Sequence, residues 1–500
     1  MPSPSSATLI RHLAELCPAD LPAPLPPGLA PALQAATATL IDAMRAEGRL
    51  AEDPLTLAMS RSVALQAEAV ARRLRGRRVL VTGGSGCVGT RLRRLIAGFQ
   101  PAVLVNLDRV PHQGEGIWAQ GDIRDPAELA EIFAATRPEV VFHLASIREP
   151  GMAERVVREA IETNVYGTRN VIEACQRAGV AHAVYSSTGK CYAYLTDHVY
   201  TASKKLAEAQ WMAAARAEGP TLFAMTRFTH VLENGVVARE IAEGIEAGLV
   251  GLHGPDRHFN VQNLRQATHL LLNALALAGQ QAPDSFWSAV DLGWPVNTLE
   301  LALHQIAASG RPVGIRFLGV PCGYDESFFR GQFDWSERHD YHPLVNALEA
   351  PTQFADRSGT MIGARVAPCP PAALRAALAQ LQETLTARPD DALAKQALLE
   401  AVRAVAAASL GGFAPARLLE ILWWGAAPEW AANAAQMQRY RPIMMLFAEA
   451  LLPALEDGGL RLEPGLQARL ADLAASFAGI AGMEALAGRC AAAIRPLQAA

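Results

Sequence analysis

Two kinds of hydrophobic pattern divide the chain. Residues 1–75 show helical periodicity in a short amphipathic segment and, after a proline-rich interruption from Pro18 to Pro31, in two longer segments near 30–48 and 55–75. From Arg77 onward, short β-branched runs alternate with longer helical patterns. The runs are Val79–Thr82, Val103–Asp108, Val140–Leu144, Ala183–Ser187 and Leu222–Phe228. Strands that alternate with helices of this length predict βαβ units and a parallel sheet.

The pattern changes again in the second half of the chain. Residues 229–366 are more mixed, with glycine and proline around 251–255 and 319–323. A proline cluster at 368–371 indicates a linker, and residues 372–500 are rich in alanine and leucine with helical periodicity throughout. We therefore expect four parts, an N-terminal helical region (1–75), an α/β domain (76–228), a smaller lobe (229–366) and a C-terminal helical domain (372–500).

Composition and charge favour a globular protein without a nucleic-acid or membrane partner. Hydrophobic residues make up 51% of the 500 positions, and the net charge is −4. Such a balance provides no broad basic field for nucleic acid or an anionic membrane. No apolar run reaches the roughly 20 residues of a membrane span, and no signal-peptide pattern opens the sequence. We expect a soluble, cytoplasmic protein.

The cysteine and histidine spacings do not predict a metal centre. The seven cysteines are scattered without a C-x-x-C pair, which suits a reducing compartment. His339 and His342 flank a carboxylate, but no third ligand follows at a suitable spacing. We interpret this segment as a polar loop and expect no metal.

A glycine-rich turn follows the first β-branched run. It places Gly83, Gly86 and Gly89, with Cys87 and Val88 between them, after a strand and before a predicted helix over 90–97. Such glycines permit a tight turn, a close approach to a pyrophosphate and close packing of the helix on the strand. The N-terminus of the helix then offers N–H groups and a positive dipole end to phosphates.

Acidic residues follow the next two strands. Asp108 ends its strand roughly 20 residues after the glycine turn, where a carboxylate binds the ribose hydroxyls of a dinucleotide. It favours NAD, whereas Arg109 beside it leaves NADP open. Asp122 and Ile123 follow a further short strand, and Asp122 is equally compatible with flanking the adenine and with a turn carboxylate.

Tyr200 and Lys204 lie four residues apart at the start of a helix predicted to continue through Ala215. This spacing puts both side chains on one face. A lysine cation stabilises a phenolate, so Tyr200 becomes able to accept a hydroxyl proton near neutral pH. Thr188, at the end of the preceding strand, supplies a hydroxyl that can share that proton.

The order of these segments resembles the extended short-chain dehydrogenases acting on nucleotide sugars, and in particular the polysaccharide-biosynthesis branch with its sugar-nucleotide 4,6-dehydratases and epimerases. The resemblance runs from about 54 to 350. Besides the motifs above, it rests on these segments: His143-Leu144-Ala145, Asn164-Val-Tyr-Gly-Thr168, Arg227-Phe-Thr-His230, Gly254-Pro-Asp-Arg257 and Asp291-Leu-Gly-Trp-Pro-Val296.

The resemblance implies a Rossmann-type doubly wound parallel sheet that binds NAD(P), a smaller α/β substrate lobe and helical appendages at both ends. It implies oxidation of a sugar hydroxyl, usually at C4, with Thr188, Tyr200 and Lys204 as catalytic residues. Leu144, Ala145 and Asn164 would support the cofactor. Arg227, His230 and Arg257 would face the substrate, although either arginine is also compatible with a structural salt bridge. That branch often has membrane-spanning helices before this domain, and this sequence shows none.

One departure leaves the reaction open. The related dehydratases read Ser-Thr-Asp-Lys where this chain reads Ser187-Thr188-Gly189-Lys190, so Lys190 is kept and the acid is lost. Dehydration and epimerisation both remain candidates. The alternatives are a plain NAD(P)-dependent dehydrogenase or reductase on a non-nucleotide sugar or polyol-like metabolite, and a non-catalytic NAD(P)-binding scaffold.

One group of tryptophans and one helix face suggest contacts outside this site. Trp423, Trp424 and Trp430 have helical spacing and are interpreted as core or interface residues. Glu208 and Trp211 follow Lys204 on its helix and are expected to face a neighbouring subunit, which predicts a homodimer by analogy with the fold class.

Overall fold

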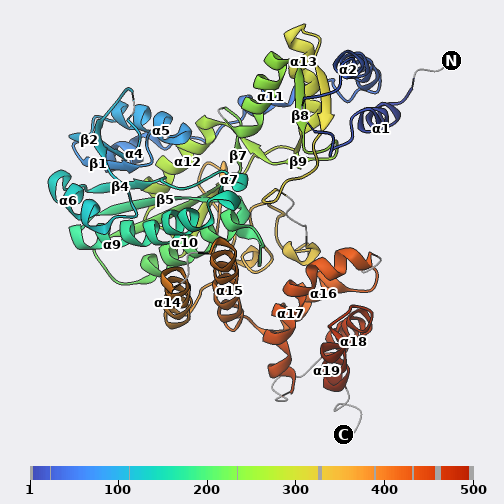
Figure 1. Cartoon of the computed structure of the whole chain (residues 1–500). Coiled ribbons are helices and arrows are strands. Elements are labelled where there is room, and N and C mark those ends of the chain that lie inside the picture. The colour runs from blue at the N-terminus through green and yellow to red at the C-terminus, as the bar shows by residue number, and fades with distance from the viewer. Residues whose placement is uncertain are drawn as a thin grey trace. The chain divides into compact units, whose positions relative to one another are not determined.

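The computed structural model describes residues 4–494 except 23, 112, 234, 325–328, 388–389, 431–432 and 457–462. The chain forms two compact units, each built from three separate segments (Figure 1). The first unit comprises Met1–Leu65, Phe228–Leu270 and Ala289–Asp325, and the second comprises Gln66–Arg227, Leu271–Ser288 and Glu326–Ala500. The division expected from the sequence at residues 75, 228 and 366 stays a prediction about separate domains.

The second unit is organised around a nine-stranded sheet with the order β14-β15-β11-β6-β5-β4-β1-β2-β3. The strands are β1 (Arg78–Thr82), β2 (Val103–Asp108), β3 (Ile117–Gln120), β4 (Val140–His143), β5 (His182–Thr188), β6 (Leu222–Phe228), β11 (Ser285–Ala289), β14 (Phe354–Ala355) and β15 (Met361–Arg365). The pairs β1–β2, β1–β4, β2–β3, β4–β5 and β6–β11 are parallel, whereas β14–β15 is antiparallel. The five strands expected from the sequence are therefore all present.

Helices cover both faces of this sheet. They are α4 (Ala67–Leu74), α5 (Cys87–Gly98), α6 (Pro126–Thr136), α7 (Pro150–Arg155), α8 (Val157–Ile161), the π-helix η1 (Glu162–Gly167), α9 (Thr168–Ala178), the 3₁₀ turn η2 (Gly189–Tyr192) and α10 (Val199–Arg216). Figure 1 shows α6, α9 and α10 on one side and α4 and α5 on the other. The predicted doubly wound, Rossmann-type parallel sheet is confirmed.

The first unit contains the N-terminal helices together with the smaller α/β lobe. Its elements are α1 (Ser6–Leu16), α2 (Leu29–Ala46), α3 (Pro54–Ser60), β7 (His230–Val231), α11 (Val236–Ala247), β8 (Leu249–Leu252), β9 (His258–Phe259), β10 (Val261–Gln262), β12 (Val296–Asn297), α13 (Thr298–Ser309) and β13 (Gly314–Phe317). Helix α12 (Leu264–Leu277) continues from this unit into the other. Buried side chains of α1 and α2, such as Leu13 and Leu40, share one core with Ile315 of β13.

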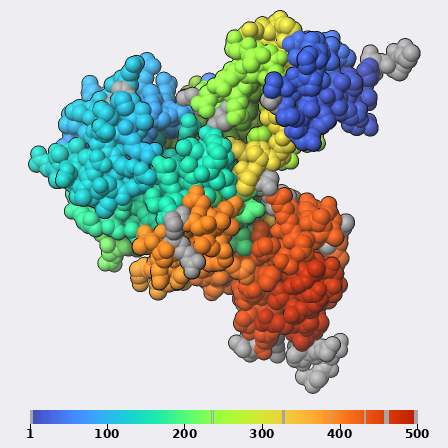
Figure 2. Space-filling view, viewed as in Figure 1, coloured from blue at the N-terminus to red at the C-terminus, as the bar shows by residue number. Residues whose placement is uncertain are grey.

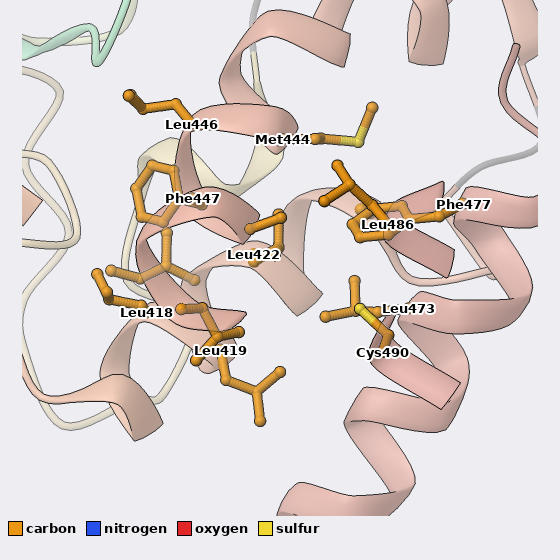
Figure 3. Close-up of a cluster of buried hydrophobic side chains, with 14 of the residues drawn as sticks. Leu418, Leu419, Leu422, Met444, Leu446, Phe447, Leu473, Phe477, Leu486 and Cys490 are labelled. Atoms are coloured by element: carbon orange, nitrogen blue, oxygen red, sulfur yellow. The ribbon is translucent and has the colours of Figure 1, made fainter. Parts of the chain in front are cut away.

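The C-terminal segment is helical in the part that the structure describes. It contains α14 (Pro371–Ala387), α15 (Asp391–Leu410), α16 (Pro415–Ala426), α17 (Ala434–Glu456), α18 (Pro464–Ala478) and α19 (Glu484–Ile494). Helices α16–α19 bury a leucine-rich core (Figure 3), in which Leu422, Phe447 and Phe477 are fully inaccessible. None of the described helices is both long and apolar enough to cross a membrane.

Helices α14 and α15 pack against the α/β part of the second unit and share its core. Leu381 and Leu398 are fully buried in one cluster with Val165 and Leu206. The Tyr166 hydroxyl donates to the Leu378 carbonyl across 2.9 Å. Figure 2 shows the orange surface of this helix pair directly against the teal surface of residues 150–210. The pair is therefore part of the fold that holds α10.

Two predicted helices differ from the observed ones. The helix expected over 90–97 begins at Cys87, because Gly86 is extended and serves as the N-cap. The helix expected over 55–75 is two helices, α3 and α4. Helix α3 ends at Ser60 since Arg61 takes extended backbone, and the Arg61 guanidinium donates to the carbonyls of Val261 and Leu292.

Candidate active site

The turn between β1 and α5 is built from glycines because side chains do not fit there. Gly83 has a φ of +71°, and a Cβ at this position would lie 2.5 Å from the Ala145 backbone nitrogen. At Gly89, a Cβ would lie 2.5 Å from the Gly84 Cα. Gly86 is exposed, and the nearest atom to a Cβ there is 3.4 Å away. The turn thus closes on the loop after β4 and leaves its Gly86 side open.

Helix α5 begins at this open side. Cys87 and Val88 form its first turn and are half-buried. Because the N-cap residue is a glycine, no side chain caps the helix. The N–H groups of a first helical turn lack intrahelical acceptors, and the dipole is positive at this end. This end of α5 is suited to an anionic group such as a phosphate.

Asp108, at the end of β2, lies against the glycine turn. Its carboxylate accepts hydrogen bonds from the backbone nitrogens of Ser85, at 3.0 Å, and of Val110, at 3.1 Å. The amide of Asn106, buried within β2, donates to the Ser85 hydroxyl across 3.0 Å. Asn106 belongs to none of the sequence motifs, and its signal in the sequence is a polar residue inside an otherwise apolar strand.

Arg109 and Asp122 belong to a network of charges beside Asp108. Arg109 pairs with Glu159 at 2.9 Å and lies 3.8 Å from Asp122. Arg124 binds the Asp122 carboxylate through two nitrogens, at 2.6 and 2.9 Å. Although burial opposes the charge, the hydrogen bonds of Arg124 and the positive charge of Arg109 lower the pKa of Asp122. This bidentate pair supports the interpretation of Asp122 as a turn carboxylate.

Ile123 and the loop after β4 are held by backbone-directed bonds. Ile123 is buried, and its carbonyl accepts from the Asn170 amide across 3.0 Å. The backbone nitrogens of Leu144 and Ala145 both donate to Thr82, the first to its carbonyl at 3.0 Å and the second to its hydroxyl at 3.4 Å. These contacts fix the loop that Gly83 approaches.

Thr188 and Lys190 lie where β5 passes into η2. The Thr188 hydroxyl is almost fully buried and accepts from the Lys190 backbone nitrogen across 3.4 Å. Lys190 is half-buried, and Gly189 between the two residues is buried. The proton-donating groups of this segment are therefore the Thr188 hydroxyl and the Lys190 ammonium.

Lys204 is a buried cation near the start of α10, one turn after Tyr200. Only 3% of it is exposed, whereas Tyr200 is half-buried. The Nζ of Lys204 donates to the Ser186 carbonyl across 2.9 Å and lies 4.4 Å from the centre of the Tyr185 ring. Burial lowers the pKa of Lys204 to about 8, an effect that the negative charge of Glu208 opposes. Most of the side chain is still protonated at neutral pH.

Asn164 lies in η1, and its amide connects the loop after β4 to α10. Its Oδ1 accepts from the Ile147 nitrogen at 2.8 Å. Its Nδ2 donates to the Ile147 carbonyl at 3.0 Å and to the Ser203 hydroxyl at 2.9 Å. The Ser203 hydroxyl in turn donates to the Tyr200 carbonyl across 2.9 Å. A π-turn often marks a functional site, and here it sets the side chain that anchors the turn containing Tyr200.

His143 and Tyr185 form a buried layer beside the site, and neither was among the site residues predicted from the sequence. The single ring of His143 forms hydrogen bonds through both of its nitrogens, Nδ1 with the Thr82 hydroxyl at 2.7 Å and Nε2 with the Thr168 hydroxyl at 3.0 Å. Burial, reinforced by the Lys204 charge, lowers the pKa of His143 to about 3. The imidazole is therefore neutral over the physiological range.

Glu208 and Trp211 face the interior of their own chain, so the prediction that they contact a neighbouring subunit is wrong. Trp211 is fully buried, and its Nε1 donates to the Ala224 carbonyl across 3.0 Å. The Glu208 carboxylate accepts from the Ser187 hydroxyl at 2.7 Å. The opposite side of α10 is covered by α14 and α15, whose presence the helical periodicity of α10 alone does not reveal.

Arg227 is held in a buried ion triad. Its NH2 lies 2.5 Å from Glu208 and 2.7 Å from Glu349, and all three side chains are at most 4% exposed. Burial raises the pKa of Glu349, whereas Arg227 and its hydrogen bonds, outweighing burial, lower that of Glu208. With its terminal nitrogens occupied, Arg227 fits the structural alternative and not the expected substrate contact.

His230 and Arg257 belong to the first compact unit, and their expected role toward a substrate stays a prediction. His230 is exposed, and its ring meets Phe259 edge-on with 5.0 Å between the ring centres.

Of the three tryptophans of the C-terminal segment, Trp424 is buried and Trp423 donates to Asp472 at 2.9 Å. Trp430 lies over the Arg330 guanidinium at 3.4 Å.

Comparison with known proteins supports the interpretation drawn from the motifs. Residues 79–323 match the family model described as polysaccharide biosynthesis protein. The chain is 29% identical over 308 residues to the probable polysaccharide biosynthesis protein EpsC of Bacillus subtilis (strain 168). This match covers 57% of this chain and 49% of that relative. A UDP-glucose 4-epimerase of Rhizobium leguminosarum bv. trifolii is 35% identical over 122 residues, 23% of this chain and 37% of the epimerase.

A solved structure agrees at the level of the fold. Pen from Bacillus thuringiensis superposes with a TM-score of 0.50 and 20% identity over 58% of this chain and 87% of Pen. The chain spans about half the length of the polysaccharide-biosynthesis relatives that it matches. The match to the family of polysaccharide biosynthesis proteins thus covers residues 79–323, just under half of this chain.

Proposed function

We propose that this chain is an NAD(P)-dependent enzyme that oxidises a sugar hydroxyl, at C4 of a nucleotide sugar, to a ketone, and then epimerises or dehydrates the product. The observation that carries the proposal is Lys204, a buried cation one turn after Tyr200, bound to the carbonyl of Ser186. A polysaccharide-biosynthesis relative and a nucleotide-sugar epimerase among the matching proteins support the same substrate class.

The glycine turn fits a dinucleotide. Gly83 and Gly89 have no room for a Cβ, whereas the Gly86 side is open toward the N-terminus of α5. Cys87, Val88 and the neighbouring N–H groups would hold the pyrophosphate, and Asp108 would hold the adenosine ribose. Asp108 favours NAD, and Arg109, already paired with Glu159, is less suited to a 2′-phosphate. When bound, the nicotinamide supplies the hydride acceptor.

The residues of the chain then act on the proton of the sugar hydroxyl. Lys204 stabilises the Tyr200 phenolate, so that the phenolate oxygen accepts this proton near neutral pH. Thr188 shares a hydrogen bond with the same hydroxyl, and its burial keeps bulk water from competing. Asn164 keeps the turn of α10 that contains Tyr200 in place through Ser203.

The step after the ketone depends on Gly189. A dehydratase needs an acid that protonates the leaving hydroxyl, and glycine donates no side-chain proton. This favours epimerisation or simple redox over 4,6-dehydration, unless Lys190, half-buried beside Thr188, takes the role of the acid.

Product analysis distinguishes these outcomes. The purified chain is incubated with NAD and, separately, with UDP-N-acetylglucosamine, UDP-glucose and dTDP-glucose, and the products are analysed by chromatography and mass spectrometry. Epimerisation keeps the mass and changes retention, dehydration removes one water, and net oxidation removes two hydrogens while NADH accumulates. Tyr200→Phe is the matched control and is expected to form none of these products. Absence of turnover with every sugar nucleotide contradicts the substrate assignment.

A further inference from the structure

Three stacked aromatic rings lie on the side of the sheet next to Lys204. The ring centres of Tyr185 and Trp211 are 5.1 Å apart, and those of His143 and Tyr185 are 5.4 Å apart, with interplanar angles of 28° and 20°. The Lys204 ammonium lies 4.4 Å from the centre of the Tyr185 ring. Residues from β4, β5 and α10 therefore form one layer in contact with this cation.

The stack is fixed in place by its polar edges. His143 is bonded on both sides by Thr82 and Thr168, and Trp211 donates to the Ala224 carbonyl. All three rings are at most 1% exposed. The buried Tyr185 ring packs against both of these anchored rings, with its face toward Lys204.

A buried ammonium needs partners that replace water. Lys204 has the Ser186 carbonyl as one such partner. The face of an aromatic ring carries partial negative charge, and it attracts a cation most strongly where water is excluded. The Tyr185 ring meets both conditions.

We propose that Tyr185 is a positioning residue, whose ring face holds the Lys204 ammonium and keeps it protonated one helical turn from Tyr200. The proposal rests on the proposed function, because Lys204 matters to the reaction through the Tyr200 phenolate. It goes further by assigning the charge state of Lys204 to a ring that no catalytic motif includes.

The titratable groups that act on Lys204 are His143 on β4, Cys191 in η2 and Glu208 on α10, and Tyr200 lies one helical turn before it. Of these groups, the Glu208 carboxylate carries a negative charge that favours the ammonium. His143 stays neutral, and burial, with the charge of Glu208, raises the pKa of the Cys191 thiol to about 12. Glu208 is bound to Arg227. Besides the Ser186 carbonyl, the Tyr185 ring lies directly against the ammonium.

The test is a direct titration of Lys204. The chain has only four lysines, at 190, 204, 205 and 395, so ¹³Cε-lysine labelling gives four NMR signals, and Lys204→Met assigns the relevant one. Tyr185→Phe keeps the ring and is expected to titrate like the wild type. Tyr185→Leu removes the ring and is expected to lower the titration midpoint by about one pH unit, a tenfold change in the ionisation equilibrium, or about 1.4 kcal/mol.

Two outcomes overturn the proposal. A second set of variants provides the test if Tyr185→Leu does not fold. Equal midpoints in Tyr185→Phe and Tyr185→Leu show that the ring does not hold the charge. If Tyr185→Leu does not fold, phenylalanines of increasing fluorination at position 185 keep the shape and remove the π charge; the midpoint must then fall stepwise, and a constant midpoint rejects the proposal. Because the titration needs no substrate, a protein without turnover still tests this proposal separately from the proposed function.

Discussion

The Ser187 hydroxyl donates to the Glu208 carboxylate across 2.7 Å. Ser187 precedes Thr188 on β5, and Glu208 lies one turn beyond Lys204 on α10. This bond therefore joins the two elements that hold the expected catalytic residues. Through Arg227, the same carboxylate is connected to β6 and to Glu349. The alignment of β5 with α10 thus depends on a buried charge cluster in which Arg227 belongs to a sequence motif and the two glutamates do not.

Glu208→Ala leaves Arg227 buried with one of its two carboxylates missing. We expect a loss of about 3–5 kcal/mol in the free energy of unfolding, as for other broken buried ion pairs, measured by urea denaturation. Glu173→Ala is the matched control, because Glu173 pairs with Arg177 at 2.6 Å on the exposed side of α9 and should cost less than about 1 kcal/mol. Equal effects of the two changes contradict the structural role of the triad.

Gly89→Ala should impair cofactor binding, because the added methyl group would collide with the Gly84 backbone. Opening the turn to relieve this contact is expected to cost about 1–3 kcal/mol and to weaken NADH binding at least tenfold, measured by fluorescence titration. Gly98→Ala, in the same helix and with no atom within 4 Å of the added Cβ, should leave NADH affinity unchanged. A Gly89→Ala protein with wild-type affinity would mean that the turn does not bind the cofactor.

His143 makes the fold sensitive to acid. Its pKa is about 3 in the folded state against 6.5 in the unfolded chain, so the unfolded chain binds more protons between these values and stability falls as pH falls below 6.5. The slope contributed is about 1.4 kcal/mol per pH unit. His143→Asn should therefore be less stable than the wild type at pH 7 but lose stability less steeply below pH 6.5. The exposed His12→Asn is the control, and it should keep the slope of the wild type.

Substitution of Leu398 tests whether α15 shares a core with α10. It is fully buried in the core shared with α10, so Leu398→Ala should cost about 2–5 kcal/mol in thermal or urea unfolding and lower turnover as α10 loosens. Gln396→Ala, on the exposed side of the same helix, should change neither quantity. If Leu398→Ala unfolds α16–α19 while the α/β part keeps its stability, α15 does not share the core of the α/β part.

The sequence was sufficient for the elements whose signal is local. The β-branched runs around Val79–Thr82 and Val103–Asp108 and the spacing of Gly83, Gly86 and Gly89 depend on neighbours along the chain, and the sheet and turn agree with them. The interpretation of Glu208 and Trp211 failed for a physical reason. The residues that bury them, such as Arg227, Ala224 and Glu349, come from distant segments of the chain. The hydrophobic periodicity of α10 does not indicate which of these segments packs on which side of the helix.

The same limit applies to Asn106 and His143. Each is a polar residue in a buried strand, which on composition alone is an unfavourable placement. Their partners, Ser85 for the first and Thr82 and Thr168 for the second, become neighbours only when the parallel strands pair. The roles of such residues follow from the register of the sheet, and the sequence does not specify that register in advance.

The interleaving of the two compact units has a consequence for synthesis of the chain. Helices α1 and α2 leave the ribosome well before β13, which begins at Gly314 and contributes Ile315 to their core. At a synthesis rate of roughly 5–20 residues per second, the apolar faces of these helices remain without β13 for on the order of ten seconds or more. Completion of the large sheet is delayed as well, since β11 and β15 follow its first strand by some two hundred residues or more. The nascent chain therefore passes through a period in which α1 and α2 depend on chaperones or on non-native contacts for protection.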